Sequence, residues 1–356
     1  MKDFEELIDE LSEESAASPQ MVQAMVELTY GCNLRCVHCY NPTHQARNEL
    51  SMEQVCRILD QLAAQGCLWV GLTGGELFTR RDALPIMRYA KSLGMIISIM
   101  TNATLVTPDI ADQIQTLEPF QLDISVYGAT AATYDHVTQV PGSFDHFVQG
   151  LDRLMERRLP VLLKLIVMTL NVHELGLMRQ FAESCSLPYR VLTEIHPRVD
   201  GSKEPLAYRL SPDQSFEIWK QEREKTGLNS SVSAAQDSCG SFGRLFDCMC
   251  GKSNAAITPH GKLNLCLSIY HPLYDLKENS LAEGWKHLVE LVASTQPGPS
   301  YECGQCDMAS QCNRGSSDGW LEQKAFDAPC IPHFKEIAEK KVQYLERSST
   351  HGNPRT

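Results

Sequence analysis

Short apolar runs alternate with amphipathic segments of helical periodicity between about residues 22 and 195. The runs are rich in Val, Ile and Leu, which is typical of strands buried inside a parallel sheet. Repeated strand–helix units of this kind predict an α/β fold with parallel strands and right-handed crossovers, either as a barrel or as an open doubly wound sheet. The predicted strands are Val22–Thr29, Cys67–Thr73, Met95–Thr101, Phe120–Val126, Val161–Thr169 and Tyr189–Ile195.

Capping residues mark the starts of three intervening helices. In a capping box, a Ser, Thr or Asn precedes the helix and a Glu or Gln three residues later bonds back to it. Proline suits the first helical position, because an N–H there has no partner within the helix. We expect capping boxes at Ser51 with Gln54 and at Asn171 with Glu174, and a third start at Thr107 followed by Pro108.

The pattern changes after a predicted helix over Ser211–Lys225. Asn229–Ser241 is rich in Ser, Ala and Gly and indicates a linker, whereas Ala255–Ile269 has two apolar runs around a turn and predicts a hairpin. The segment Pro297–Pro332 is dense in Gly, Pro, Cys and Asp. Because such a segment can hardly bury a core of its own, bound metal is expected to stabilise it. A last helix is predicted over roughly His333–Arg347.

The length of 356 residues allows two domains and a sizeable core. We place the boundaries at 1–20 for an acidic N-terminal segment, 21–228 for the strand–helix repeats and 239–356 for a small Cys-rich domain.

Charge and hydropathy narrow the functional classes. The chain has 32 Lys plus Arg against 44 Asp plus Glu, a formal net charge of −12, so it lacks the basic surface of a nucleic-acid-binding protein. The longest apolar run, Leu159–Leu170, is interrupted by Lys164 and is too short to cross a bilayer, so no membrane partner is expected. Residues 1–20 have neither a basic start nor an apolar core, so a cytoplasmic protein without a secretory signal is expected.

Fourteen cysteines in such a protein indicate metal or redox chemistry, because disulfides are disfavoured in a reducing cytoplasm. The first group, Cys32, Cys36 and Cys39, follows the first predicted strand in one loop and can supply three thiolates to one centre. A structural zinc would need a fourth ligand, for which His38 or His44 is a candidate. A [4Fe–4S] cluster held by three thiolates would instead leave one iron open for a further ligand.

The spacing Cys-x3-Cys-x2-Cys resembles the signature of the radical S-adenosylmethionine (SAM) superfamily. The resemblance implies that the open iron binds the amino and carboxylate groups of SAM. One electron, supplied by a reductant such as flavodoxin or ferredoxin, would then break a C–S bond and yield a 5′-deoxyadenosyl radical. By the same resemblance, His38 occupies the position whose ring packs near the adenine of SAM.

Further motifs of this family follow in order, each at the end of a predicted strand. Gly74-Gly75-Glu76 alone would indicate only a strand-to-helix turn. In the family this segment contacts the SAM ammonium group. Glycines allow the backbone to approach SAM closely, and the carboxylate can pair with the cation. Thr101-Asn102-Ala103-Thr104 is similar to the family's Thr-Asn-Gly-Thr, but the Ala puts a positive φ there in question. The resemblance implies SAM-positioning roles for Gly74, Gly75, Glu76, Asn102 and Ser125.

The family likeness also selects among folds. It implies a partial (β/α)6 TIM-like barrel, whose active site lies at the carboxyl ends of the strands. Tyr127 stands where many relatives have Asp, and Lys164 points either into the barrel or outward. Tyr127, Lys164 and Tyr301 are candidates for the acid or base that completes the reaction.

The second group of cysteines resembles the SPASM extension of radical SAM enzymes, which usually carries two auxiliary iron–sulfur clusters. Four of its positions match one complete four-thiolate site: Cys303, Cys306, Cys312 and Cys330. Without the resemblance, a pair of zinc ribbons would explain these spacings.

The other auxiliary site retains Cys248, Cys250 and Cys266, while Gly315 or Ser316 fills the position of an expected fourth Cys. Three outcomes follow from this incomplete set. The site recruits Cys239, keeps an open iron, or holds a smaller cluster.

Together these features predict a radical SAM enzyme that abstracts hydrogen from a substrate C–H bond, with auxiliary clusters in electron transfer. Many SPASM enzymes modify ribosomally made peptides or proteins, so a peptide substrate is expected. Two alternatives remain. One is decarboxylation or dehydrogenation of a porphyrin or other small molecule, and the other is a non-catalytic binding protein stabilised by zinc.

Overall fold

The computed structural model describes residues 19–226, 245–246, 248–271 and 273–350. The chain divides into two compact units. The barrel unit comprises residues up to Tyr208 together with Cys250–Ala293, and the C-terminal unit comprises Arg209–Met249 and the residues from Ser294 onward. The predicted linker and Cys239 lie outside the described residues, as do residues 1–18 of the acidic segment.

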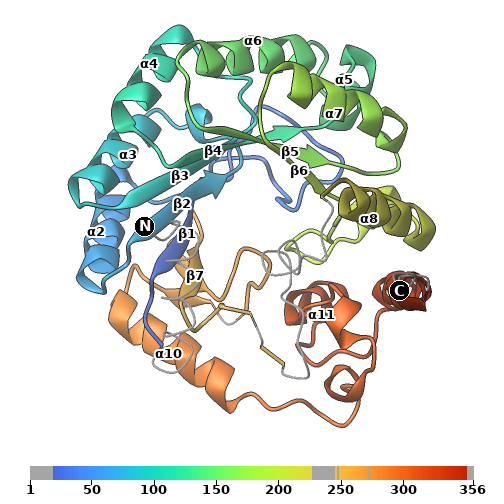
Figure 1. Ribbon diagram of the computed structural model, residues 1–356. Coiled ribbons are helices and arrows are strands. Elements are labelled where there is room, and N and C mark those ends of the chain that lie inside the picture. Colours follow the sequence, from blue (N-terminus) through green and yellow to red (C-terminus); the bar gives the residue numbers. More distant parts are fainter. Residues whose placement is uncertain (1–18, 227–244, 247, 272, 351–356) are drawn as a thin grey trace, which may run out of the picture. The chain divides into compact units, whose positions relative to one another are not determined.

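The first six strands of the nine-stranded sheet in the barrel unit are parallel, and among these six, neighbours in the sheet are also neighbours in sequence (Figure 1). This order decides between the two predicted architectures, because a doubly wound sheet starts in its middle and reverses direction. The fold is therefore a TIM-like partial barrel, as expected. The strands are β1 (Gln23–Thr29), β2 (Trp69–Gly74), β3 (Ile96–Thr101), β4 (Gln121–Val126), β5 (Val161–Ile166) and β6 (Tyr189–Leu192).

Helices cover the outer face of these strands (Figure 1). Each buries an apolar stripe against the sheet; α6, for example, buries Phe147, Leu151 and Leu154. The helices of this layer are α2 (Met52–Ala64), α3 (Ala83–Ser92), α4 (Pro108–Leu117), α5 (Ala131–Thr138), α6 (Ser143–Glu156) and α7 (Leu175–Ser184). The unit also has the short 3-10 turns η1 (Leu77–Thr79), η2 (Val172–Glu174) and η3 (Glu204–Tyr208).

Two of the three predicted helix starts are confirmed. Ser51 and Gln54 form a reciprocal capping box at the start of α2. The Thr107 side chain accepts the N–H of Ile110 at the start of α4, with Pro108 in the first turn.

The predicted capping box of Asn171 with Glu174 is wrong. Asn171 uses its amide to hold the backbone, donating to the carbonyls of Tyr127 and Ile166 at 2.8 Å each. Glu174 accepts the N–H of Ala129, the second residue before α5, at 2.7 Å and makes no capping bond to its own helix. A local spacing rule cannot anticipate a hydrogen bond to a segment more than forty residues away.

The chain returns to the barrel unit after residue 249. Strand β7 (Asn254–Ile257) pairs in parallel with β1, and β8 (Lys262–Asn264) and β9 (Tyr274–Asp275) continue the sheet in antiparallel pairing. The predicted hairpin is thereby confirmed. The helix α10 (Leu281–Ser294), which the sequence reading did not identify, follows these strands.

The C-terminal unit contains the helices α8 (Pro212–Thr226), α11 (Ser316–Gln323) and α12 (Pro332–Thr350). Phe216 and Trp219 of α8 pack against Tyr344 of α12, with ring centroids 6.1 and 5.9 Å apart. Between the helices lie two 3-10 turns, η4 (Cys303–Gln305) and η5 (Ala309–Gln311). Throughout the described part of the chain, no helix is both long enough and apolar enough to span a bilayer.

Candidate active site

Cys32, Cys36 and Cys39 all line one cavity of about 280 Å³ at the carboxyl ends of the parallel strands. The loop that carries them is fixed by backbone hydrogen bonds to the end of α5: the N–H of Arg35 donates to the carbonyl of Thr138 at 2.9 Å, and that of Val37 to the carbonyl of Val137 at 3.1 Å. The three thiols are thus presented on one side by a loop with a defined conformation.

These thiols are suited to a cationic centre. Burial raises the pKa of Cys32 to about 12, and burial also raises the pKa of Cys36 and of Cys39. Such thiols stay protonated at neutral pH unless a metal centre takes the place of the protons. A three-thiolate iron–sulfur site fits this donor set. Among the described residues no three His, Cys, Asp or Glu side chains are grouped so as to hold a single metal ion.

The glycine pair Gly74-Gly75 lets the end of β2 approach the segment that leads into the cysteine loop. A Cβ on Gly74 would lie 2.2 Å from the carbonyl oxygen of Thr29, and one on Gly75 would lie 2.2 Å from that of Gly31. The Gly75 N–H donates to the Thr29 carbonyl at 2.7 Å. Any side chain here would push away the strand end from which the cysteine loop starts. Both glycines also line the cavity.

Glu76 is fully buried and does not line the cavity. Its carboxylate accepts the Thr101 hydroxyl at 2.7 Å and the Asn102 N–H at 2.8 Å. Burial raises the pKa of Glu76, and these hydrogen bonds act against that rise. The side chain therefore supports the turn after β3, and its expected contact with SAM stays a prediction.

A second network ties this turn to the cysteine loop. The Asn102 amide donates to the side-chain oxygen of Asn33 at 3.1 Å, and the Asn33 amide donates to the Thr104 hydroxyl at 2.8 Å. Ala103 has a φ of 62°, so it adopts the positive angle that its replacement of Gly had put in question. Its carbonyl lies so close to Gly150 of α6 that a Cβ there would approach it to 2.0 Å.

His38 and Tyr127 form one wall of the cavity, with ring centroids 5.1 Å apart. Burial lowers the pKa of His38 to about 4, so its ring is neutral at physiological pH. Its Nδ1 is buried and has no hydrogen-bond partner within the described residues. A neutral ring with a free nitrogen is available to a bound ligand.

Lys164 points inward. It lines the cavity, and its ammonium lies 2.5 Å from the carboxylate of Asp123. Ser125 and Tyr127 line the same cavity. This result decides between the two predicted orientations of Lys164. Asp123 was missed by the sequence reading, although β4 and β5 place it opposite Leu162, two residue pairs from Ser125 and Lys164. The sequence reading also passed over other lining residues, among them Tyr40, Thr73, Met100, Glu194 and His196.

Behind the cavity, three tyrosine hydroxyls surround the buried carboxylate of Glu27. Tyr40, which lines the cavity, donates to it at 2.7 Å, Tyr270 at 2.8 Å and Tyr30 at 3.3 Å. Burial raises the pKa of Glu27 to about 7, against the lowering effect of these bonds. Nothing in the local sequence indicates this cluster, because Tyr270 comes from beyond β8.

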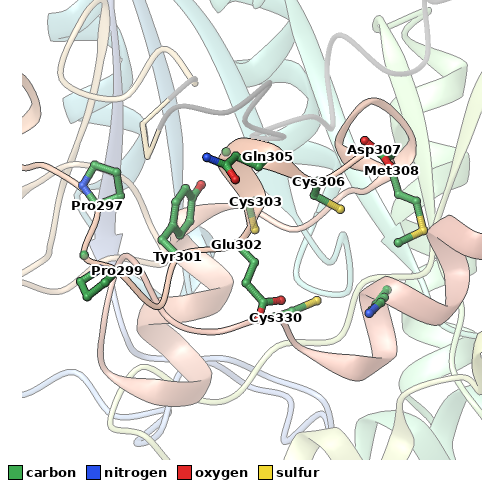
Figure 2. Close-up of a pocket in the computed structure, with 13 residues that line it drawn as sticks. Pro297, Pro299, Tyr301, Glu302, Cys303, Gln305, Cys306, Asp307, Met308 and Cys330 are labelled. Carbon is green, nitrogen blue, oxygen red and sulfur yellow. The ribbon is translucent and has the colours of Figure 1, made fainter.

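In the C-terminal unit, the four cysteines of the predicted four-thiolate site line a common pocket: Cys303, Cys306, Cys312 and Cys330. Three of them, Cys303, Cys306 and Cys330, also border an outer cavity of about 750 Å³, where Tyr301 and Glu302 lie beside them (Figure 2). The candidate Tyr301 therefore belongs to this second site.

The other predicted auxiliary ligands are distributed differently. Both Cys250 and Cys266 lie in the barrel unit. The backbone of Cys250 pairs with that of Asn254 in an isolated β-bridge before β7, and the backbone of Cys266 pairs with that of Ile269 after β8. Cys248 belongs to the C-terminal unit. Ser316, at the position of the expected fourth Cys, donates its hydroxyl to the Leu245 carbonyl. A shared site for these cysteines stays a prediction.

A protein-family model described as the Radical SAM superfamily matches residues 26–182, which hold the three cysteines and all the strand-end motifs. These residues form a radical SAM domain, and the chain is a radical SAM enzyme. It is similar to the mycofactocin maturase MftC of Mycobacterium tuberculosis, with 28% identity over 90% of this chain and 85% of that protein. It is also similar to an AdoMet-dependent heme synthase of Methanosarcina barkeri, with 25% identity over 80% of this chain and 88% of that protein.

The crystal structure of SuiB from Streptococcus suis bound to S-adenosylmethionine shares the fold. Its TM-score is 0.70 at 14% identity, covering 94% of this chain and 84% of that one. SuiB bound to its precursor peptide SuiA matches with a TM-score of 0.69 at 13% identity, covering 93% of this chain and 79% of that one.

Proposed function

We propose that this enzyme binds SAM in the cavity of the barrel unit and modifies a ribosomally made peptide. The observation that carries the proposal is the convergence of Cys32, Cys36 and Cys39 on one cavity that is also lined by His38, whose Nδ1 has no hydrogen-bond partner among the described residues. The peptide substrate is supported by the similarity to MftC, a maturase, along most of both chains.

In this proposal the three cysteines hold a [4Fe–4S] cluster. When bound, the cluster and SAM supply a 5′-deoxyadenosyl radical that abstracts a hydrogen atom from the substrate. Gly74, Gly75, Asn102 and Ser125 position SAM at the cavity wall, and Glu76 acts through Asn102. The walls exclude water and hold the substrate hydrogen in place. Tyr127 and Lys164 line the cavity and are the groups proposed to hold or move a proton there.

The C-terminal unit is proposed to hold an auxiliary cluster on Cys303, Cys306, Cys312 and Cys330, which share one pocket. The same proposal assigns a second auxiliary cluster to Cys248, Cys250 and Cys266, with Cys239 as the recruited fourth ligand. A flavodoxin or ferredoxin is the proposed reductant. All thirteen described cysteines are free thiols, which suits the reducing cytoplasm proposed as its location.

The first test is the iron, sulfide and zinc content of the anaerobically purified protein. We expect about eight to twelve iron per chain, falling by about four in a Cys32/Cys36/Cys39→Ala variant. A Cys303/Cys306/Cys312/Cys330→Ala variant is expected to lose about four as well. The wild type, once reduced, should release 5′-deoxyadenosine from SAM, whereas the first variant should not. Zinc in place of iron would refute the proposal and leave the zinc-stabilised binding protein.

A second candidate substrate is an iron porphyrin, favoured by the similarity to the heme synthase of Methanosarcina barkeri over 80% of this chain. The two substrates are separable by experiment. An iron coproporphyrin that binds should shift its Soret band on titration with the protein, and turnover should remove carboxyl groups from it. A mycofactocin-type precursor peptide should instead change mass only when SAM and reductant are present.

A further inference from the structure

The pocket of four cysteines in the C-terminal unit contains a buried arginine. Arg314 is 3% exposed, and its Nη1 donates to the Sγ of Cys303 at 3.1 Å. Its Nη2 donates to the carbonyl of Ala328 at 2.6 Å, and its Nε is buried with no hydrogen-bond partner among the described residues. The guanidinium also lies over the ring of Tyr301, 5.9 Å from its centroid.

This cation has no carboxylate partner among the described residues. Arg209, a largely buried arginine of the same unit, contrasts with it, because its Nη2 pairs with Glu322 at 2.8 Å. Burying a charge without a counter-ion costs folding free energy, so a guanidinium in this position is expected to have a negative charge beside it. The thiols of the pocket supply that charge once they bind a metal centre as thiolates.

Arg314 also contacts the pocket through its backbone. Burial raises the pKa of the Cys312 thiol, and the backbone of Arg314 acts against that rise. Replacing the Arg314 side chain removes its hydrogen bond to Cys303 and leaves this effect of the backbone in place.

We propose that Arg314 raises the reduction potential of the auxiliary cluster held by Cys303, Cys306, Cys312 and Cys330. The inference rests on the proposed function, which supplies that cluster. Reduction adds one negative charge to a centre that is already anionic with four thiolate ligands. A cation hydrogen-bonded to a ligand sulfur stabilises the reduced form more than the oxidised form, so it favours uptake of an electron. Arg314 is a positioning residue in this scheme, because it acts on the cluster through Cys303.

The test is a potentiometric titration followed by electron paramagnetic resonance in the Cys32/Cys36/Cys39→Ala background, which removes the catalytic cluster. Arg314→Gln should shift the reduction equilibrium at least tenfold toward the oxidised form, which for a one-electron couple is about 59 mV more negative. Arg314→Lys keeps the charge without the planar fork and should shift it less. The readout is a potential and does not depend on substrate or turnover.

Lys335 provides the matched control. It lines the same pocket, and its charge acts against the rise that burial causes in the pKa of Cys330, but its ammonium donates no hydrogen bond to a sulfur in the described structure. Lys335→Gln therefore removes an equal charge, and its shift should be smaller than that of Arg314→Gln. Equal shifts would overturn the role of the hydrogen bond, and an unchanged potential in Arg314→Gln would overturn the inference.

Iron content separates this inference from the proposed function. If the background protein holds no cluster that depends on Cys303, the auxiliary-cluster proposal itself is wrong. If the cluster is present at full iron content and its potential does not move, only the role of Arg314 is wrong. If both Arg314 variants lose iron while their helical circular dichroism is unchanged, the proposed effect on the reduction potential is wrong, and Arg314 is needed for cluster assembly instead.

Discussion

The carboxylate of Glu76 accepts the backbone N–H of Asn102 at 2.8 Å, so the end of β2 holds the turn that follows β3. Glu76 is fully buried and accepts from Thr101 as well. The residue that sequence comparison places against SAM therefore acts in the structure as the support of its neighbour in the cavity wall.

Glu76→Gln should accordingly lower both stability and SAM affinity. The amide nitrogen is a donor and would face a donor, which leaves a buried group unsatisfied at a cost of about 1–3 kcal/mol. Urea denaturation and calorimetric titration of the reconstituted protein with SAM measure the two effects. Unchanged stability with lost SAM binding would show instead that the carboxylate contacts SAM directly.

Gly75→Ala should damage the catalytic cluster site selectively. The added Cβ would lie 2.2 Å from the Gly31 carbonyl and displace the start of the cysteine loop. We expect a loss of about four iron per chain, with the remaining iron retained. Gly176→Ala in α7 is the control, because nothing lies within 4 Å of a Cβ there. Full iron content in Gly75→Ala would contradict the close approach.

Stability should fall as pH rises between about 4.5 and 7 on account of Glu27. Its folded pKa, about 7, lies above the ordinary 4.5, so the folded state binds the proton more tightly than the unfolded state does. The contribution is complete below pH 4.5 and is lost as pH rises through 7. A shift of this size corresponds to roughly 3 kcal/mol at most.

Glu27→Gln removes this titration and should flatten the dependence of melting temperature on pH in that interval. Asp152→Asn, at an exposed position of α6, is the control and should leave the slope as it is. Equal slopes in the wild type and in Glu27→Gln would show that the carboxyl does not titrate in this range.

The ion pair of Lys164 with Asp123 should appear as coupling in a double-mutant cycle. Lys164→Met leaves Asp123 buried without its cation, and a loss of about 1–3 kcal/mol is expected because Lys164 is partly exposed. Adding Asp123→Asn to Lys164→Met should recover part of the lost free energy of unfolding, because the unpaired buried charge is removed. Additive effects of the two changes, measured by urea denaturation, would mean that the pair contributes nothing.

Much of the fold was accessible from the sequence because it is encoded locally. Buried parallel strands show as apolar runs, and Cys spacing within one loop determines which thiols can reach one centre. The strand-end motifs gave the correct edge of the sheet for the cavity. The family resemblance chose the barrel, which the periodicity alone left open.

What the sequence did not provide depends on contacts between distant segments. Glu174 accepts the N–H of Ala129 just before α5 and does not cap its own helix, and Tyr270 reaches Glu27 from beyond β8. Arg314 looks like one more charged residue in an irregular segment until its guanidinium is placed on Cys303. Such pairings are set by packing in three dimensions, for which no spacing rule exists.

The pairing of β7 with β1 has a consequence for the order in which the protein is made. Strand β1 has a partner on one side as soon as β2 is synthesised. Its other edge stays unpaired until β7 is made, and β7 begins more than two hundred residues after the end of β1. During that interval the nascent chain carries an unpaired strand edge, which is prone to association with other chains. Completion of the sheet therefore waits for a segment that is encoded after α8, and a chain that stops at Tyr208 would keep the exposed edge permanently.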